Sequence, residues 1–212
     1  MSIVRDAGAS DRALRGEMAA RVAAYDWSRT PLGDRESWSP SLKLIAATML
    51  ASQFPMAVRW GPDFVLIYND GYIPILGEKH PRALGLPFRE AWPEVEDQLG
   101  PLHEGLLAGT RQAFFSEDMP LRLRRHGEAL EEVWFTVCYS PIPDDTAPSG
   151  VGGVLLTAVE TTDRKRVERA LREREADDCR EQLEGGSVHG GISCPLYLVY
   201  RGDRVARAAR RA

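Results

Sequence analysis

Cysteine is scarce in this sequence and offers no basis for a disulfide framework or a zinc site. The three cysteines, Cys138, Cys179 and Cys194, are odd in number and widely spaced, and no Cys-x-x-Cys pair occurs. Disulfide scaffolds carry even sets of cysteines, and zinc sites need clustered ligands. We therefore expect reduced cysteines, no metal site and a cytoplasmic location.

Long apolar runs are also missing, which argues against a membrane span. The longest run, Leu44–Val58, is interrupted by polar residues and a proline. It is shorter than the roughly 20 apolar residues that cross a bilayer. Charged residues from Arg5 to Arg12 occupy the place of the apolar segment of a signal peptide. We expect a soluble protein with no membrane partner.

The sequence has no excess of positive charge and no catalytic motif. Its formal net charge is -4 and its pI is about 5.7, so we expect no nucleic-acid partner. It lacks a P-loop, a Ser/His/Asp motif and a cluster with metal-ligand spacing. We expect no enzymatic activity from this chain.

Periodicity divides the chain into helical and strand segments. Apolar residues at helical spacing predict helices over Ser10–Ala24, with Ser10 as its cap, and over Pro40–Ser52. These helices form an N-terminal cap over residues 1–51. From Pro55 onward the two-residue period of strands predominates. The expected strands cover residues 56–60, 64–68, 112–124, 130–140 and 151–159.

Helical segments are expected between the second and third strands. The longest covers Pro93–Ala108, and Pro101 inside it is expected to kink or split it. Shorter pieces are expected at Tyr72–Leu76 and Pro81–Leu84. The order of elements predicts an α+β fold, with an antiparallel five-stranded sheet and a helical insertion between strands 2 and 3.

The last strand leads almost directly into a charged helix. The apolar segment 151–159 is followed by a helix expected over Arg164–Leu183, whose sparse apolar seam suits a short coiled coil. Thr161 and Thr162 lie between them and offer side-chain oxygens to the first helical amides. A buried strand joined to an exposed helix without a linker is expected to transmit movement from one to the other.

Many short motifs occur in a characteristic order between about Tyr25 and Glu173. They are Asp26-Trp27-Ser28-x-Thr30-Pro31-Leu32-Gly33, Phe54-Pro55-Met56, Arg59-Trp60-Gly61-Pro62, Tyr68-Asn69-Asp70-Gly71-Tyr72, Leu76-Gly77-x-Lys79-His80-Pro81, Ala83-Leu84-Gly85, Trp92-Pro93-Glu94, Tyr139-Ser140-Pro141-Ile142 and Glu160-Thr161-Thr162. Together they resemble a PAS domain, in particular the N-terminal sensory PAS region of bacterial sensor histidine kinases.

The resemblance implies a domain organisation and a function. A helical cap over 1–51 would precede a PAS domain over 52–162, an output helix over 163–184 and a tail over 185–212. The domain would bind a small ligand or a partner and relay the change through its C-terminal helix in two-component-type signalling. Glu160, Thr161 and Thr162 would fasten the last strand to that helix, with Glu160 replacing the family's usual Asp.

The kinase part of such proteins is not recognisable here. None of the four histidines, His80, His103, His126 and His189, lies in a His-Glu-x-x-x-Pro motif, and no glycine-rich nucleotide box follows. The chain is therefore expected to be the sensory part of a larger protein or a stand-alone PAS protein.

In a PAS domain a ligand would lie between the sheet and the helical insertion. The expected walls, which alternatively form a filled core, are Val58, Trp60, Ile67, Tyr72, Trp92, His103, Leu106, Phe115, Trp134, Phe135 and Val154.

His103 is a candidate haem ligand, since some PAS domains carry one on this helix, although its neighbours do not match the haem-binding pattern. Flavin is not expected, because no cysteine lies in the Asn-Cys-Arg context of light-sensing members. Cys138, inside a strand, is expected in the core.

Three functions remain open at this stage. The first is a sensory module that acts as a homodimer through its N-terminal and C-terminal helices and signals to a kinase or response regulator. The second is a ligand-free dimerisation or interaction domain. The third is a haem-based gas sensor.

Overall fold

The computed structural model describes residues 16–184, apart from the side chains of residues 179 and 181–184. The chain divides into two compact units, Met1–Thr162 and Asp163–Ala212. The expected cap at Ser10 and the tail after residue 184 lie outside the described residues. No helix in the described part of the chain is long and apolar enough to cross a membrane.

Two helices precede the sheet. Helix α1, Glu17–Ala24, buries Met18 and Val22, and its first two amides donate to the carboxylate of Asp70. Short 3-10 turns at Trp27–Arg29 (η1) and Arg35–Ser37 (η2) lead to helix α2, Pro40–Leu50. Ser39 caps α2 by accepting a hydrogen bond from the Leu42 amide, and Pro40 suits the first helical turn.

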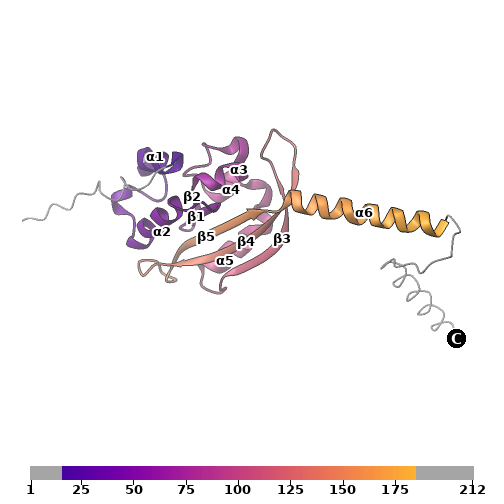
Figure 1. Ribbon diagram of the computed structural model, residues 1–212. Helices are drawn as coiled ribbons and strands as arrows, with labels where there is room; N and C mark the ends of the chain where they lie inside the picture. The colour runs from indigo at the N-terminus through magenta and orange to yellow at the C-terminus, as the bar shows by residue number, and fades with distance from the viewer. Residues whose placement is uncertain (1–15, 185–212) are drawn as a thin grey trace, which may run out of the picture. The chain divides into compact units, whose positions relative to one another are not determined.

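A five-stranded antiparallel sheet follows, in the order β2-β1-β5-β4-β3 (Figure 1). The strands are β1 Met56–Trp60, β2 Val65–Tyr68, β3 Phe114–Leu123, β4 Glu131–Pro143 and β5 Val151–Glu160. The predicted α+β class and the antiparallel five-stranded sheet are confirmed.

The helical insertion connects β2 to β3. Its elements are η3 Asp70–Tyr72, α3 Ile73–Leu76, η4 Gly77–Lys79, α4 Phe88–Ala91, η5 Pro93–Val95 and α5 Glu96–Leu107. The segment Pro81–Leu84 forms turns instead of the expected helix. Helix α5 continues through Pro101, so the expected split does not occur.

The two faces of the sheet differ in composition. On β4, Val133, Phe135, Val137 and Tyr139 are buried, whereas the residues between them are only half-buried. Cys138 belongs to the half-buried set, so the prediction that it lies in the core was wrong. The cause is alternation, since successive strand residues point to opposite faces.

Helix α6, Thr162–Glu184, begins two residues after β5 ends. Along it, the apolar side chains Val167 and Leu171 are exposed to 69% and 57%. The helix is otherwise dominated by charged residues, several of which pair at i,i+3 or i,i+4 spacing.

Asn69 fastens the N-terminal helices to the sheet. Its side chain is fully buried, and the two protons of its amide nitrogen are shared among the backbone carbonyls of Met49, Ser52 and Phe54. Its side-chain oxygen accepts from the amides of Met56 and Tyr72. These five hydrogen bonds join the end of α2, the start of β1 and the first turn of the insertion.

Replacing Asn69 by Ala should lower the free energy of unfolding by about 3 kcal/mol or more, because several buried backbone groups lose their only side-chain partner. Urea denaturation measures this change. The control, Gln53→Ala, alters an exposed side chain close by and should change stability by less than about 0.5 kcal/mol. Equal effects of the two substitutions would contradict the role assigned to Asn69.

Candidate functional site

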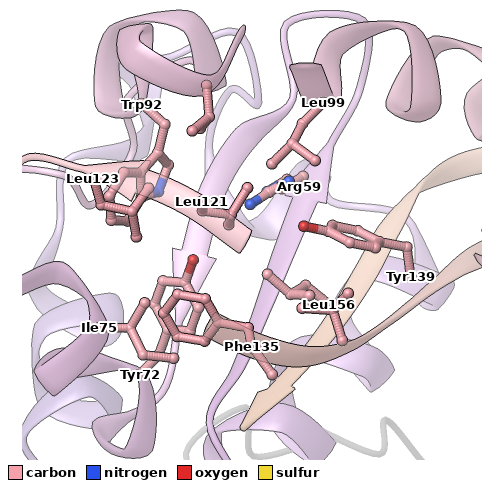
Figure 2. A pocket seen from close by; sticks show the side chains of 13 residues that line it. Arg59, Tyr72, Ile75, Trp92, Leu99, Leu121, Leu123, Phe135, Tyr139 and Leu156 are labelled. Carbon is pink, nitrogen blue, oxygen red and sulfur yellow. The ribbon is translucent and has the colours of Figure 1, made fainter. Parts of the chain in front are cut away.

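A small cavity lies within the core of the first unit (Figure 2). Its volume is about 20 Å³, which is enough for roughly one water-sized occupant. The lining residues come from β1, the insertion and the last three strands. They are Arg59, Tyr72, Ile75, Trp92, Val95, Leu99, Leu121, Leu123, Phe135, Val137, Tyr139, Leu156 and Ala158.

Arg59 is the unusual member of this set. It lies in the middle of β1 and is only 2% exposed. Its Nη1 donates to Nε2 of His103, and its guanidinium lies 4.2 Å from the ring centre of Phe88 and 5.5 Å from that of Tyr139. These contacts stabilise the cation in part. It forms no ion pair with any carboxylate whose side chain the structure describes.

Three polar atoms around Arg59 are buried without a hydrogen-bond partner. They are Arg59 Nε, Trp92 Nε1 and His103 Nδ1. Arginine and tryptophan side chains only donate hydrogen bonds. The cavity is therefore a mostly apolar space with donors and two tyrosine hydroxyls in its wall and a positive charge that no carboxylate of the lining balances. Figure 2 shows the Arg59 guanidinium and the hydroxyls of Tyr72 and Tyr139 directed toward its interior.

His103 is neutral in this environment. Burial, together with the Arg59 charge, lowers its pKa from 6.5 to about 2. Since Nε2 accepts from Arg59, the ring proton must lie on Nδ1. The ring packs edge-on against Phe88 with centres 4.6 Å apart.

The surroundings of His103 do not fit a haem group. Its Nε2 is occupied by a guanidinium, which would also repel a ferric iron. The adjacent cavity is far smaller than the roughly 300–1,000 Å³ of ordinary cofactor pockets. The same volume excludes a flavin from the cavity as it stands.

The structure divides the predicted pocket residues into three groups. Tyr72, Trp92 and Phe135 line the cavity. His103, Leu106 and Val154 are fully buried but do not line it. The remaining five, which are Val58, Trp60, Ile67, Phe115 and Trp134, lie elsewhere.

Those five residues were assigned to the wrong face of the sheet. Arg59 lines the cavity, so its neighbours Val58 and Trp60 point to the opposite face. Ile67 pairs with Val58 and shares that face. For Phe115 and Trp134, the strand register and the alternation of side chains along a strand likewise show that they face away from the cavity.

Phe115 and Trp134 illustrate the error most clearly. Phe115 pairs with Cys138 on the half-buried face and is 61% exposed. Trp134 precedes the cavity residue Phe135, and two consecutive strand residues cannot face the same side. The prediction that both line a pocket was wrong.

Arg59 was the functional candidate that sequence reasoning missed. It stands between apolar residues in Met56-Ala57-Val58-Arg59-Trp60, and a charge in a short apolar strand is the signal that could have identified it. The residues that were predicted to line the pocket are apolar or aromatic, so their side chains did not suggest a charged group in the core.

The end of β5 is held by a network of hydrogen bonds. Glu160 forms a two-pronged ion pair with Arg125, with Nη1–Oε2 at 2.7 Å and Nη2–Oε1 at 3.2 Å. Arg125 is 8% exposed, and it also contacts Glu131 on β4. The shape of the guanidinium matches a carboxylate, so this pair fixes the last strand to the β3–β4 hairpin.

The two threonines reinforce this attachment. The Thr161 amide donates to the Trp134 carbonyl at 2.7 Å, and its hydroxyl donates to Asp118 at 2.8 Å. The Thr162 hydroxyl accepts from the Trp134 amide and donates to Glu160. Both hydroxyls thus bond back to strands of the sheet, that of Thr161 to Asp118 and that of Thr162 to Trp134 and Glu160, whereas the sequence predicted that they cap the helix. We call residues 160–162 with Arg125 and Trp134 the joint.

A larger open groove lies at the other end of β5. Its volume is about 560 Å³, in the range of small-molecule pockets. Trp60, Phe64, Leu107 and the 144–149 loop contribute to its walls. Asp144 in this loop is engaged with Ser39 and Thr146, which hold its pKa below the usual value against the opposing effect of burial.

No family model and no curated protein matches the sequence. Among solved structures, the chain is similar to a PAS domain from Colwellia psychrerythraea (16% identity, TM-score 0.42, covering 57% of this chain and 98% of that one). It is also similar to the PAS domain of Bordetella pertussis BvgS (18%, 0.41, 64% and 98%) and to a Rhodobacter sphaeroides LOV protein (16%, 0.45, 81% and 97%).

The chain's own topology agrees with the resemblance in its sequence. An antiparallel five-stranded sheet with its helices inserted between β2 and β3 is the arrangement that the sequence predicted, and the structure adds the strand order β2-β1-β5-β4-β3. The fold is PAS-like. In this PAS-like fold the cavity lies between the sheet and the insertion, where the resemblance places a ligand.

The low pKa of His103 predicts a specific dependence of stability on pH. The unfolded chain protonates this histidine near pH 6.5, whereas the folded chain does so near pH 2. Its contribution is therefore complete above pH 6.5 and is lost as the pH falls toward 2. Between pH 7 and pH 5 the loss is about 2 kcal/mol.

Denaturation at both pH values, with His103→Gln, measures this contribution. The glutamine keeps an acceptor for Arg59 but cannot titrate, so the stability difference between pH 7 and pH 5 should shrink by about 2 kcal/mol. His126→Gln, at a side chain that is 61% exposed, is the matched control. An unchanged difference in His103→Gln would show that the imidazole is not buried as described.

Proposed function

We propose that this chain is a sensory module of two-component-type signalling, in which a ligand or partner acting on the core changes the output helix α6. The observation that carries the proposal is the continuity between cavity and joint. Phe135 lines the cavity and pairs with Glu160, and its neighbour Trp134 holds Thr161 and Thr162. A shift of β4 at the cavity therefore displaces the residue at which α6 begins.

The module itself performs no catalysis in this proposal. It acts as a homodimer through its N-terminal and C-terminal helices and signals to a kinase or response regulator. The exposed Val167 and Leu171 support this, since they lie at i,i+4 spacing on α6 and form one apolar stripe.

Coupling through the joint can be tested without knowing the ligand. Phe135→Leu alters the cavity wall, and hydrogen exchange of residues 163–184 reports the response of α6. We expect Phe135→Leu to change protection in that segment about fivefold or more. Two glycines inserted after Thr162 should abolish this response while the change near residue 135 persists.

Two glycines inserted after Gln112, in an exposed connection, provide the matched control and should leave the response intact. If hydrogen exchange of residues 163–184 is the same with and without Phe135→Leu, the proposed coupling between the cavity and α6 is contradicted.

The small cavity volume favours a second candidate, a ligand-free interaction domain. Under this alternative the core binds no ligand and only stabilises the fold. The exposed Phe54 and Phe115 then belong to an interface with a partner. Native mass spectrometry of undenatured protein distinguishes the two candidates. A retained small ligand supports sensing, and a dimer without ligand supports the alternative.

A further inference from the structure

The Arg59 guanidinium presents an unbalanced charge to the core. Arginine stays protonated at any accessible pH. A buried charge is normally paired, because its desolvation is otherwise not offset. Here the described partners are a neutral imidazole, two aromatic rings and the uncharged hydroxyls of Tyr72 and Tyr139. The missing component is a negative charge.

We propose that the cavity beside Arg59 binds a small inorganic monovalent anion, of the size of chloride or nitrate, and that this anion is the input of the module. The binding site is argued from Arg59, Trp92 and the cavity alone. Its role as an input rests on the sensory function proposed above.

The polar groups of the cavity wall suit an anion better than water. Arg59 Nε and Trp92 Nε1 are both buried and unpartnered, and both residues line the cavity. These two groups can only donate, and although the Tyr72 and Tyr139 hydroxyls can accept from a bound water, a neutral water leaves the guanidinium charge uncompensated. An anion accepts from every donor and places its charge against the guanidinium.

No anion of the protein competes for this position. None of the lining residues is an aspartate or glutamate. Glu96, whose Oε2 is also buried without a partner, does not line the cavity. Burial raises the pKa of the Tyr72 and Tyr139 hydroxyls, and the Arg59 charge offsets only part of that rise, so both phenols stay neutral.

The size of the cavity limits the ligand. A volume of about 20 Å³ accepts one water-sized particle. The apolar residues Leu99, Leu121 and Leu156 close the space around the donors. Halide-sized and small planar anions therefore fit best, while organic anions such as isethionate are too large.

Thermal unfolding of the full chain tests the site, with chloride, nitrate or isethionate as sodium salts at matched ionic strength. Chloride or nitrate should raise Tm saturably relative to isethionate, by roughly 2–4 °C at about five times Kd. Arg59→Met should remove this anion-specific increment whatever it does to the basal Tm. Trp92→Phe, which deletes one donor, should weaken the apparent affinity.

Arg29→Met, at an exposed arginine, is the matched control and should retain the whole increment. Crystals grown with bromide should show an anomalous peak in the cavity that is absent in Arg59→Met. The proposal is overturned if the three salts act alike, if Arg59→Met keeps the increment, or if bromide does not occupy the cavity.

These experiments distinguish a failure of the anion-binding proposal from a failure of the signalling proposal. If the anion binds but hydrogen exchange of residues 163–184 does not respond to nitrate, the site stands and its role as an input is wrong. If no anion binds, the relay from Phe135 through the joint can still be tested as described above.

Discussion

The burial of one guanidinium governs the organisation of this core. Arg59 lies on the central part of the sheet beneath the insertion, where water cannot solvate its charge. The residues around it compensate in different ways. His103 accepts one hydrogen bond and stays neutral, Phe88 and Tyr139 provide ring faces, and the remaining donors surround a small space. The core is therefore electrostatically incomplete as well as closely packed.

An incomplete core can exist in two states whose balance depends on an occupant. The cavity wall shares Phe135 with the strand pair that ends at the joint. The joint is held by several bonds, since Glu160 pairs with Arg125 and accepts from Thr162, and both threonines bond to the Trp134 backbone. A rigid connection of this kind transmits a displacement, whereas a flexible one would absorb it. In the function proposed above, the chemistry of the core and the attachment of β5 act together.

Much of the architecture was predictable from sequence because its signals are local. The change from helical to strand period after Pro55 located the sheet, and the Thr161–Thr162 pair located the transition to α6. The face of the sheet to which each strand residue points was harder to predict. Trp134 and Phe135 are adjacent and similar in chemistry, so composition favours both as pocket walls, and only the register with β5 shows that one of them faces the other side.

The charged centre could not be derived from local patterns. An arginine in Met56–Trp60 fits an exposed edge equally well, and its burial depends on α4 and α5, whose sequences lie about thirty to forty residues further along the chain. The same holds for Arg125, which is buried by its pairing with Glu160, 35 residues further along the chain. Long-range contacts decided both positions, through packing against Phe88 and His103 for Arg59 and through the ion pair with Glu160 for Arg125.

The state of Arg59 in solution is the most direct test of this account. Its Nε–H signal can be assigned in ¹⁵N NMR spectra by comparison with Arg59→Met. The account predicts a proton protected from solvent exchange, whose chemical shift changes saturably with nitrate and not with isethionate. A signal that exchanges as rapidly as that of an exposed arginine, or that ignores nitrate, would contradict it.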